Sequence, residues 1–109
     1  MSDEFIAAVI LTWLNPEPSF ELGVVVATPG ALDLLKSKDL NSAEFIRLHH
    51  TGMWGDLCDE DWEQNRLAVE TGEGRIMSVY VVDEATDERL WIITESDRSA
   101  TTLLLPIEY

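Results

Sequence analysis

Two histidines, a cysteine and several carboxylates crowd the middle of the chain, where they could hold a metal ion. His49 and His50 precede Asp56, Cys58 and Asp59. Imidazole, thiolate and carboxylate are ligand types that zinc prefers. Neighbouring residues of a helix point about 100° apart, however, so His49 and His50 cannot easily face one ion. The spacing also fits no zinc motif, and we predict no metal and no cofactor, with one histidine in the core and the other at the surface.

A second polar run, residues 94–102, separates two apolar segments. It contains Glu95, Asp97 and Arg98, which could form a carboxylate pair beside an anion-binding guanidinium. Alternatively, the run is a tight turn whose Ser and Asp side chains bind their own backbone, and Arg98 pairs with an acid such as Asp56. Because serine and aspartate are ordinary turn residues, we favour the turn.

Motifs for several reaction classes are absent from the sequence. There is no G-x-S-x-G nucleophile turn, and neither G-x-x-x-x-G-K-[ST] nor G-x-G-x-x-G is present to bind phosphate. The seven basic residues are scattered and form no stripe for nucleic acid. The sequence therefore favours a protein without catalytic activity and without direct nucleic-acid binding.

The charge balance indicates a basic partner. Twenty-one acidic residues against seven basic ones give a net charge of −14, which repels DNA, RNA and anionic lipid. Solubility alone is the plainer explanation of such acidity. The sharper hypothesis is a carboxylate array, with Trp54 as its apolar contact, that enters a cationic groove in place of phosphates. The array consists of Asp56, Asp59, Glu60, Asp61 and Glu63.

Three helices are expected to position these groups. Thr28 and Pro29 predict a helix from residue 29 to about 36 that buries Leu32 and Leu35. Asn41 begins a capping-box-like sequence, which predicts a second helix to about residue 50. A third helix is expected from Asp59 to Thr71, with acids in its first turn and glycines after its end.

Strands are expected on both sides of the helices. Residues 20–27 predict a buried strand, because three valines stand at the centre of this segment. Residues 75–82, 89–94 and 101–105 predict a three-stranded antiparallel meander. We therefore predict an α+β fold whose mainly antiparallel sheet carries two or three helices on one face.

Length and composition are typical of one domain. The 109 residues, 46% of them apolar, can form a single core, so residues 1–109 are assigned to one domain. Residues 1–19 are either a peripheral strand or an extension, since the prolines at positions 16 and 18 separate them from the rest. The apolar stretch 5–14 is too short to cross a membrane. A single cysteine fits a reducing compartment, and we predict a cytoplasmic location.

Three stretches of the sequence carry a family resemblance. They are Ala27-Thr28-Pro29-Gly30-Ala31; His49 and His50 with Gly52-x-Trp54-Gly55-Asp56-Leu57, Glu60, Asp61 and Asn65; and Trp91 to Pro106 with Glu108-Tyr109. Over residues 22–109 the chain resembles a largely uncharacterised family of small proteins carried on plasmids and integrated mobile elements. Members often carry the label of a type I restriction enzyme subunit, but this chain lacks the glycine loop of a methyltransferase. The resemblance implies a mobile-element setting, in which small acidic proteins often antagonise host defence.

Three hypotheses follow for the function. The leading one is a non-catalytic inhibitor of a host restriction or CRISPR nuclease, acting through the acidic array. The second is a small enzyme or ligand-binding domain with a pocket formed by His49, Asp56, Asn65, Glu95, Asp97 and Arg98. The third is a homodimer whose polar cluster is structural. An enzyme needs these groups to converge in a cleft, whereas an inhibitor needs acids on an open face.

Overall fold

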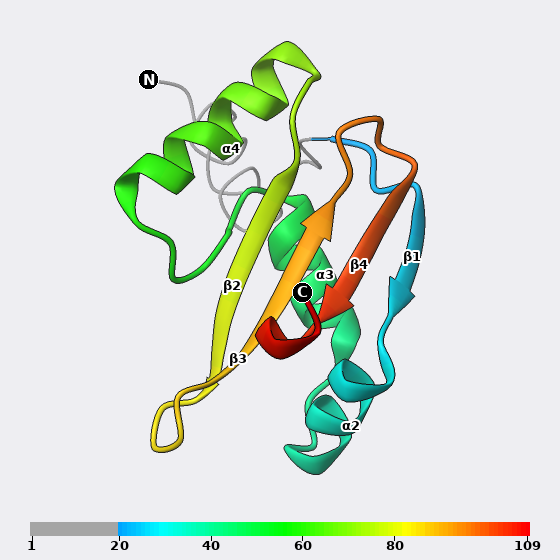
Figure 1. The fold of residues 1–109 in the computed structure, drawn as a ribbon, viewed down its shortest axis with the longest axis vertical. Coiled ribbons are helices and arrows are strands. Elements are labelled where there is room, and N and C mark those ends of the chain that lie inside the picture. The colour runs from blue at the N-terminus through cyan, green and yellow to red at the C-terminus, as the bar shows by residue number, and fades with distance from the viewer. Residues whose placement is uncertain (1–19) are drawn as a thin grey trace, which may run out of the picture.

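A four-stranded mixed sheet organises the chain (Figure 1). The computed structural model describes residues 20–109, and its strands lie in the order β1-β4-β3-β2. The strands are β1 (Val24–Ala27), β2 (Ile76–Asp83), β3 (Glu88–Thr94) and β4 (Ala100–Leu104). β3 pairs antiparallel with both β2 and β4, and β1 pairs parallel with β4. The fold is therefore α+β with a mostly antiparallel sheet, as predicted, although the parallel strand was not part of the prediction.

The helices begin at the residues that the capping pattern predicts. They are α2 (Pro29–Ser37), α3 (Ser42–His50), α4 (Asp59–Thr71) and a short 3-10 helix, η1 (Pro106–Glu108). The side chain of Thr28 accepts a hydrogen bond from the amide of Ala31 at 3.1 Å, and that of Asn41 accepts from Ala43 at 3.0 Å. Each interaction satisfies an amide that the first helical turn leaves without a partner. These three helices are confirmed.

The main core lies between the sheet and the two helices α2 and α3, and Figure 1 shows α3 behind the sheet. It contains Ala31 and Leu35 of α2 together with strand residues from β2, β3 and β4. Ala31, Leu34 and Leu35 are the buried residues of α2, at the spacing that one face of a helix requires. The prediction for Leu32 is wrong: it lies to the side of this buried face, about 100° around the helix from Ala31, and is 53% exposed.

The strand expected at residues 20–27 is shorter and far more exposed than predicted. Only Val24–Ala27 form β1, and Val24, Val25 and Val26 are 66%, 41% and 46% exposed. Among the strands of residues 20–109, β1 stands at the end of the sheet and has a single neighbour, β4. A run of valines indicates a strand but does not reveal how many neighbours that strand has.

Two predictions, those on residues 1–19 and on the apolar stretch 5–14, lie outside the described residues. The assignment of residues 1–19 to a strand or an extension concerns a segment that the structure does not describe. None of the helices described within residues 20–109 has the length and apolar character needed to cross a membrane.

Candidate functional site

An acidic face formed by Asp59, Glu60 and Glu63 lies at the amino-terminal half of α4. All three side chains are exposed, and helical periodicity places them on the side opposite the buried Asn65 and Ala68. Asp59 and Glu60 form no ion pair with any basic side chain of residues 20–109. The acidic face therefore presents negative charge to solvent.

Glu63 differs from its neighbours because it has a partner. Arg66 donates to its carboxylate at 2.7 Å and to that of Glu70 at 2.8 Å. The hydrogen bond from Arg66 lowers the pKa of Glu63, so this carboxylate stays ionised to more acidic pH. Both side chains are more than half exposed, so the pair adds little to stability.

Two predicted members of the array, Asp56 and Asp61, and its predicted apolar contact, Trp54, lie elsewhere. Asp56 forms an ion pair with Arg89 at 3.0 Å. Asp61 lines a small pocket of about 240 Å³ beside Asn65, on a different side of α4 from the acidic face. Trp54 is only 6% exposed, so its expected role as the apolar contact is wrong. The indole packs inside the protein at 5.0 Å from the ring of Trp62, which explains why a large aromatic residue stands in this loop.

Leu67 is the apolar residue that the acidic face does contain. It follows Glu63 by four residues and Glu60 by seven, and it is 39% exposed. That spacing places it beside both carboxylates on one face of the helix. The same spacing can be found in the sequence, but the prediction assigned the apolar contact to Trp54 instead of Leu67.

The side chain of Asn65 fixes α4 against the edge of β2. Its amide nitrogen donates to the carbonyl of Met77 at 2.7 Å, and its oxygen accepts from the amide of Met77 at 3.0 Å. This pair of bonds replaces the strand that would otherwise satisfy the edge. Asn65, which was predicted to line a pocket, therefore has a structural role.

The loop before α4 closes the next position of the same edge. The amide of Val79 donates to the carbonyl of Trp54 at 3.0 Å, and the amide of Asp56 donates to the carbonyl of Val79 at 2.7 Å. Gly55 lies between them with φ of 82°, and a Cβ there would stand 2.1 Å from the carbonyl oxygen of Val79. Only glycine fits this approach. Together Asn65 and the loop set the position of the acidic face.

Arg98 belongs to a structural turn rather than to an anion site. Asp97 accepts a hydrogen bond from the amide of Ser99 at 2.9 Å, and hydrogen bonds from Ser99 lower the pKa of Asp97. The predicted pairing of Arg98 with Asp56 is wrong, and the turn itself is confirmed. The guanidinium instead joins the β3–β4 turn to the end of α4 by donating to the carbonyl oxygens of Ala68, Gly74, Glu95 and Ser96.

His49 lies in the core at the start of a chain of polar side chains. Its Nδ1 is 2.5 Å from Ser78 Oγ and its Nε2 is 2.8 Å from Thr94 Oγ1. Thr94 is 2.7 Å from Thr101, which donates to the carbonyl of Leu22 at 2.7 Å. Burial lowers the pKa of His49 to about 3, with a smaller contribution from the charge of His50. The ring is therefore neutral at physiological pH, and its nitrogens are both occupied.

His50 occupies the position expected of the second histidine. It is half-buried, and its Nε2 lies 2.7 Å from the carbonyl oxygen of Phe20. Within residues 20–109, no three side chains among His, Cys, Asp and Glu lie close enough together to hold a metal ion.

The alternative pocket does not form. Its six predicted residues divide among the core, the β2 edge, an ion pair with Arg89 and the β3–β4 turn. Only Glu95 and Asp97 share a hollow, which is shallow and polar and contains Ser96 and Ser99. These six residues therefore do not converge on one cleft, as the ligand-binding hypothesis requires.

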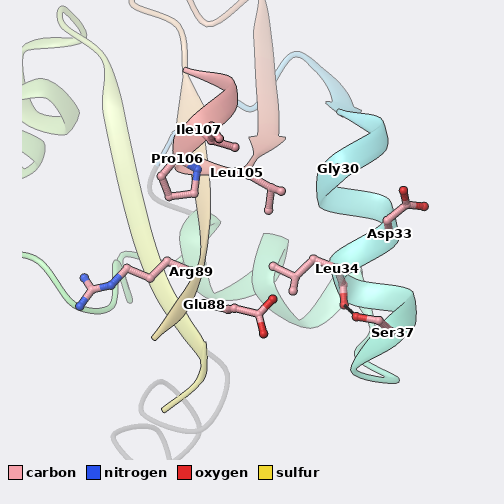
Figure 2. A pocket seen from close by; sticks show the side chains of 9 residues that line it. All are labelled: Gly30, Asp33, Leu34, Ser37, Glu88, Arg89, Leu105, Pro106 and Ile107. Atoms are coloured by element: carbon pink, nitrogen blue, oxygen red, sulfur yellow. Dashed lines mark hydrogen bonds between the residues drawn. The ribbon is translucent and has the colours of Figure 1, made fainter. Parts of the chain in front are cut away.

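The sequence did not indicate an open hollow of about 620 Å³ between α2 and η1, which Figure 2 shows from close by. Leu34, Leu105 and Ile107 form its apolar part, and Asp33 and Glu88 stand on its rim. It contains none of the histidines. No family model, no curated protein and no solved structure matches this chain. The geometry defines an acidic α+β protein with an exposed carboxylate face on α4.

Proposed function

We propose that the protein is a non-catalytic binding protein that presents the acidic face of α4 to a basic surface of another protein. The observation that carries this proposal is the exposure of Asp59, Glu60 and Glu63 on a helix that Asn65 holds against the sheet. Because the helix is held in place, its backbone loses little freedom on binding, and that part of the entropy cost of association is small. Leu67, beside them, supplies apolar contact area.

The partner that best fits this face is a cationic groove that otherwise holds nucleic acid. A net charge of −14 steers such an encounter and repels nucleic acid itself. The resemblance to proteins of mobile elements narrows the class to a nuclease of host defence, of the restriction or CRISPR type. The protein would then act by competing with DNA or RNA for the groove.

The test is inhibition of DNA cleavage by a type I restriction enzyme and by a CRISPR nuclease, with the triple variant Asp59→Asn, Glu60→Gln, Glu63→Gln as the comparison. We expect the wild-type protein to inhibit one of these nucleases and the variant to inhibit weakly. Association should slow more than dissociation speeds up, because exposed charges act mainly on the encounter. Inhibition by the wild type should also weaken with salt, since the Debye length falls from about 8 Å at 0.15 M to about 3 Å at 1 M.

A matched variant separates the acidic face from charge in general. Asp39→Asn, Glu44→Gln, Glu84→Gln removes the same charge from exposed positions outside α4, and it should inhibit like the wild type. Both variants should melt near the wild-type temperature. Unchanged inhibition by the α4 variant would contradict the acidic face, and a wild-type protein that spares both nucleases would contradict the proposed partner class.

A further inference from the structure

The two edge strands of the sheet, β1 and β2, differ in whether other groups bind the backbone on their outer sides. The first half of the β2 edge, at Met77 and Val79, is closed by Asn65 and by the loop around Gly55. The β1 edge is open: no strand of residues 20–109 pairs with it on the side away from β4. Figure 1 shows β1 at the margin of the sheet, remote from α4. An open edge is a template for another strand, and proteins usually protect it with charged residues or proline.

The backbone of β1 offers hydrogen bonds on this open side. The amide of Val24 donates to Ser99 at 3.0 Å and that of Thr28 donates to Leu103 at 2.9 Å, both toward β4. Since the amides of alternate residues in a strand point to the same side, Val25 and Ala27 direct theirs away from β4. The side chains add apolar area, because three consecutive valines of β1 are between 41% and 66% exposed. Neither charge nor proline interrupts them.

Carboxylates stand at both ends of this apolar strand. Before β1, Glu21 is exposed, and Asp97 lies in the turn whose Ser99 accepts from Val24. After β1, Glu108 accepts from the hydroxyl of Thr28 at 2.6 Å, and Asp33 is exposed in the first turns of α2. The guanidinium of Arg98, in the same turn as Asp97, donates to the backbone of α4 and of its own loop. The edge is thus an apolar strand between two acidic ends.

We propose that β1 accepts an extended segment of a basic partner as a fifth strand, with apolar or β-branched residues opposite the valines and Lys or Arg at both ends. Backbone hydrogen bonds to Val25 and Ala27 would supply affinity, and the flanking charges would select the segment. A second copy of this chain fits less well, because each copy brings a net charge of −14 to the junction. The β1 site is separate from the acidic face of α4, and the proposal for β1 does not depend on the function proposed for that face.

The probe is the synthetic peptide KKVTVTVKK, with EEVTVTVEE as its acidic twin. NMR of the isotopically labelled protein should show binding of the basic peptide and none of the acidic one. Amide hydrogen exchange should slow at Val25 and Ala27 on binding, while the amides of α4 stay unchanged. Exchange at these two amides reads the added strand directly and needs no variant.

Variants at one position then test the backbone contact. Val25→Pro removes an outward amide that β4 does not use, so the fold should tolerate it as edge strands tolerate proline. Affinity for the basic peptide should fall about tenfold, because a backbone hydrogen bond is lost and the ring obstructs the approach. Val25→Thr keeps the amide and should bind like the wild type, and so should the triple variant of the acidic face.

Three results would overturn the proposal. One is binding of the basic peptide without slower exchange at Val25 and Ala27. Another is equal binding of the acidic peptide, which would remove the charge argument. The third is a dimer of the free protein that Val25→Pro dissociates, since this would assign the edge to a second copy.

Discussion

The buried His49 makes stability depend on pH in a way that the structure quantifies. Its pKa is about 3 in the fold, against an ordinary value of 6.5 in an unfolded chain. The unfolded state therefore binds a proton first as pH falls. The stabilisation is complete above the unfolded value and is lost progressively between that value and the folded one. At about pH 5.5, one unit below the unfolded value, the loss is about 1.4 kcal/mol.

The assay is urea unfolding of the wild type and of His49→Gln at about pH 8 and about pH 5.5, the range over which an ordinary histidine titrates. His50 is present in both proteins, so its titration cancels in the comparison. Paired carboxylates act at lower pH: Lys38 lowers the pKa of Asp83 below its ordinary 3.8, and this stabilisation is lost only as pH falls toward that range. We expect wild-type stability to fall by about 1.4 kcal/mol more than that of the variant.

Equal pH dependence in the two proteins would refute this reasoning. It would mean that His49 takes up a proton in the fold as easily as in the unfolded chain, and hence that the core admits charge at this point. The variant need only fold well enough for a transition to be measured, because the quantity compared is the change with pH rather than the absolute stability.

Two further variants test how the β2 edge is closed. Gly55→Ala should cost more than about 3 kcal/mol or prevent folding, because its Cβ would stand 2.1 Å from a carbonyl oxygen, whereas Gly72→Ala, with similar φ and open space around it, should cost only about 1–2 kcal/mol. Thermal melting of the two variants compares them, and equal losses would show that the close approach is unimportant. Asn65→Ala should cost about 2–3 kcal/mol in urea unfolding, because both bonds to Met77 are lost, while the exposed Gln64→Ala should cost under about 0.5 kcal/mol. A neutral Asn65→Ala would mean that another group satisfies the edge.

Local chemistry made the helices and the β3–β4 turn predictable. The bounds of α4 follow from acids at its start and from Gly72, which takes a left-handed conformation at its end. Thr28 and Asn41 act within three residues of themselves. The same holds for Asp97, whose carboxylate binds the amide two residues later. Signals of this range are complete in the sequence, because the donor and the acceptor are neighbours along the chain.

Features that depend on distant partners could not be predicted in the same way. Val24, Val25 and Val26 carry the composition of a buried strand, but their exposure depends on which elements occupy the ends of the sheet. Trp54 could contact a partner or its own core, and that choice depends on Trp62 and Ala68 of α4. Asn65 looks like a pocket residue until Met77 is placed beside it. In each case the residue type indicated a kind of role, but the sequence did not show which distant residue would lie beside it.

The parallel pairing of β1 with β4 has a consequence for synthesis of the chain. Val24 of β1 pairs with Ala100 of β4, so the first of the four strands in the sequence pairs only with the last. By contrast, β2 and β3 are joined by a short turn. A contact between residues so far apart in the sequence forms slowly, because the entropy of closing a long loop is lost before the stabilising contacts form. During translation the valines emerge early and cannot pair with β4 until their partners, residues 100–102, have left the ribosome. Until then the nascent chain exposes an apolar strand that chaperones can bind, and the acidic residues around it limit self-association.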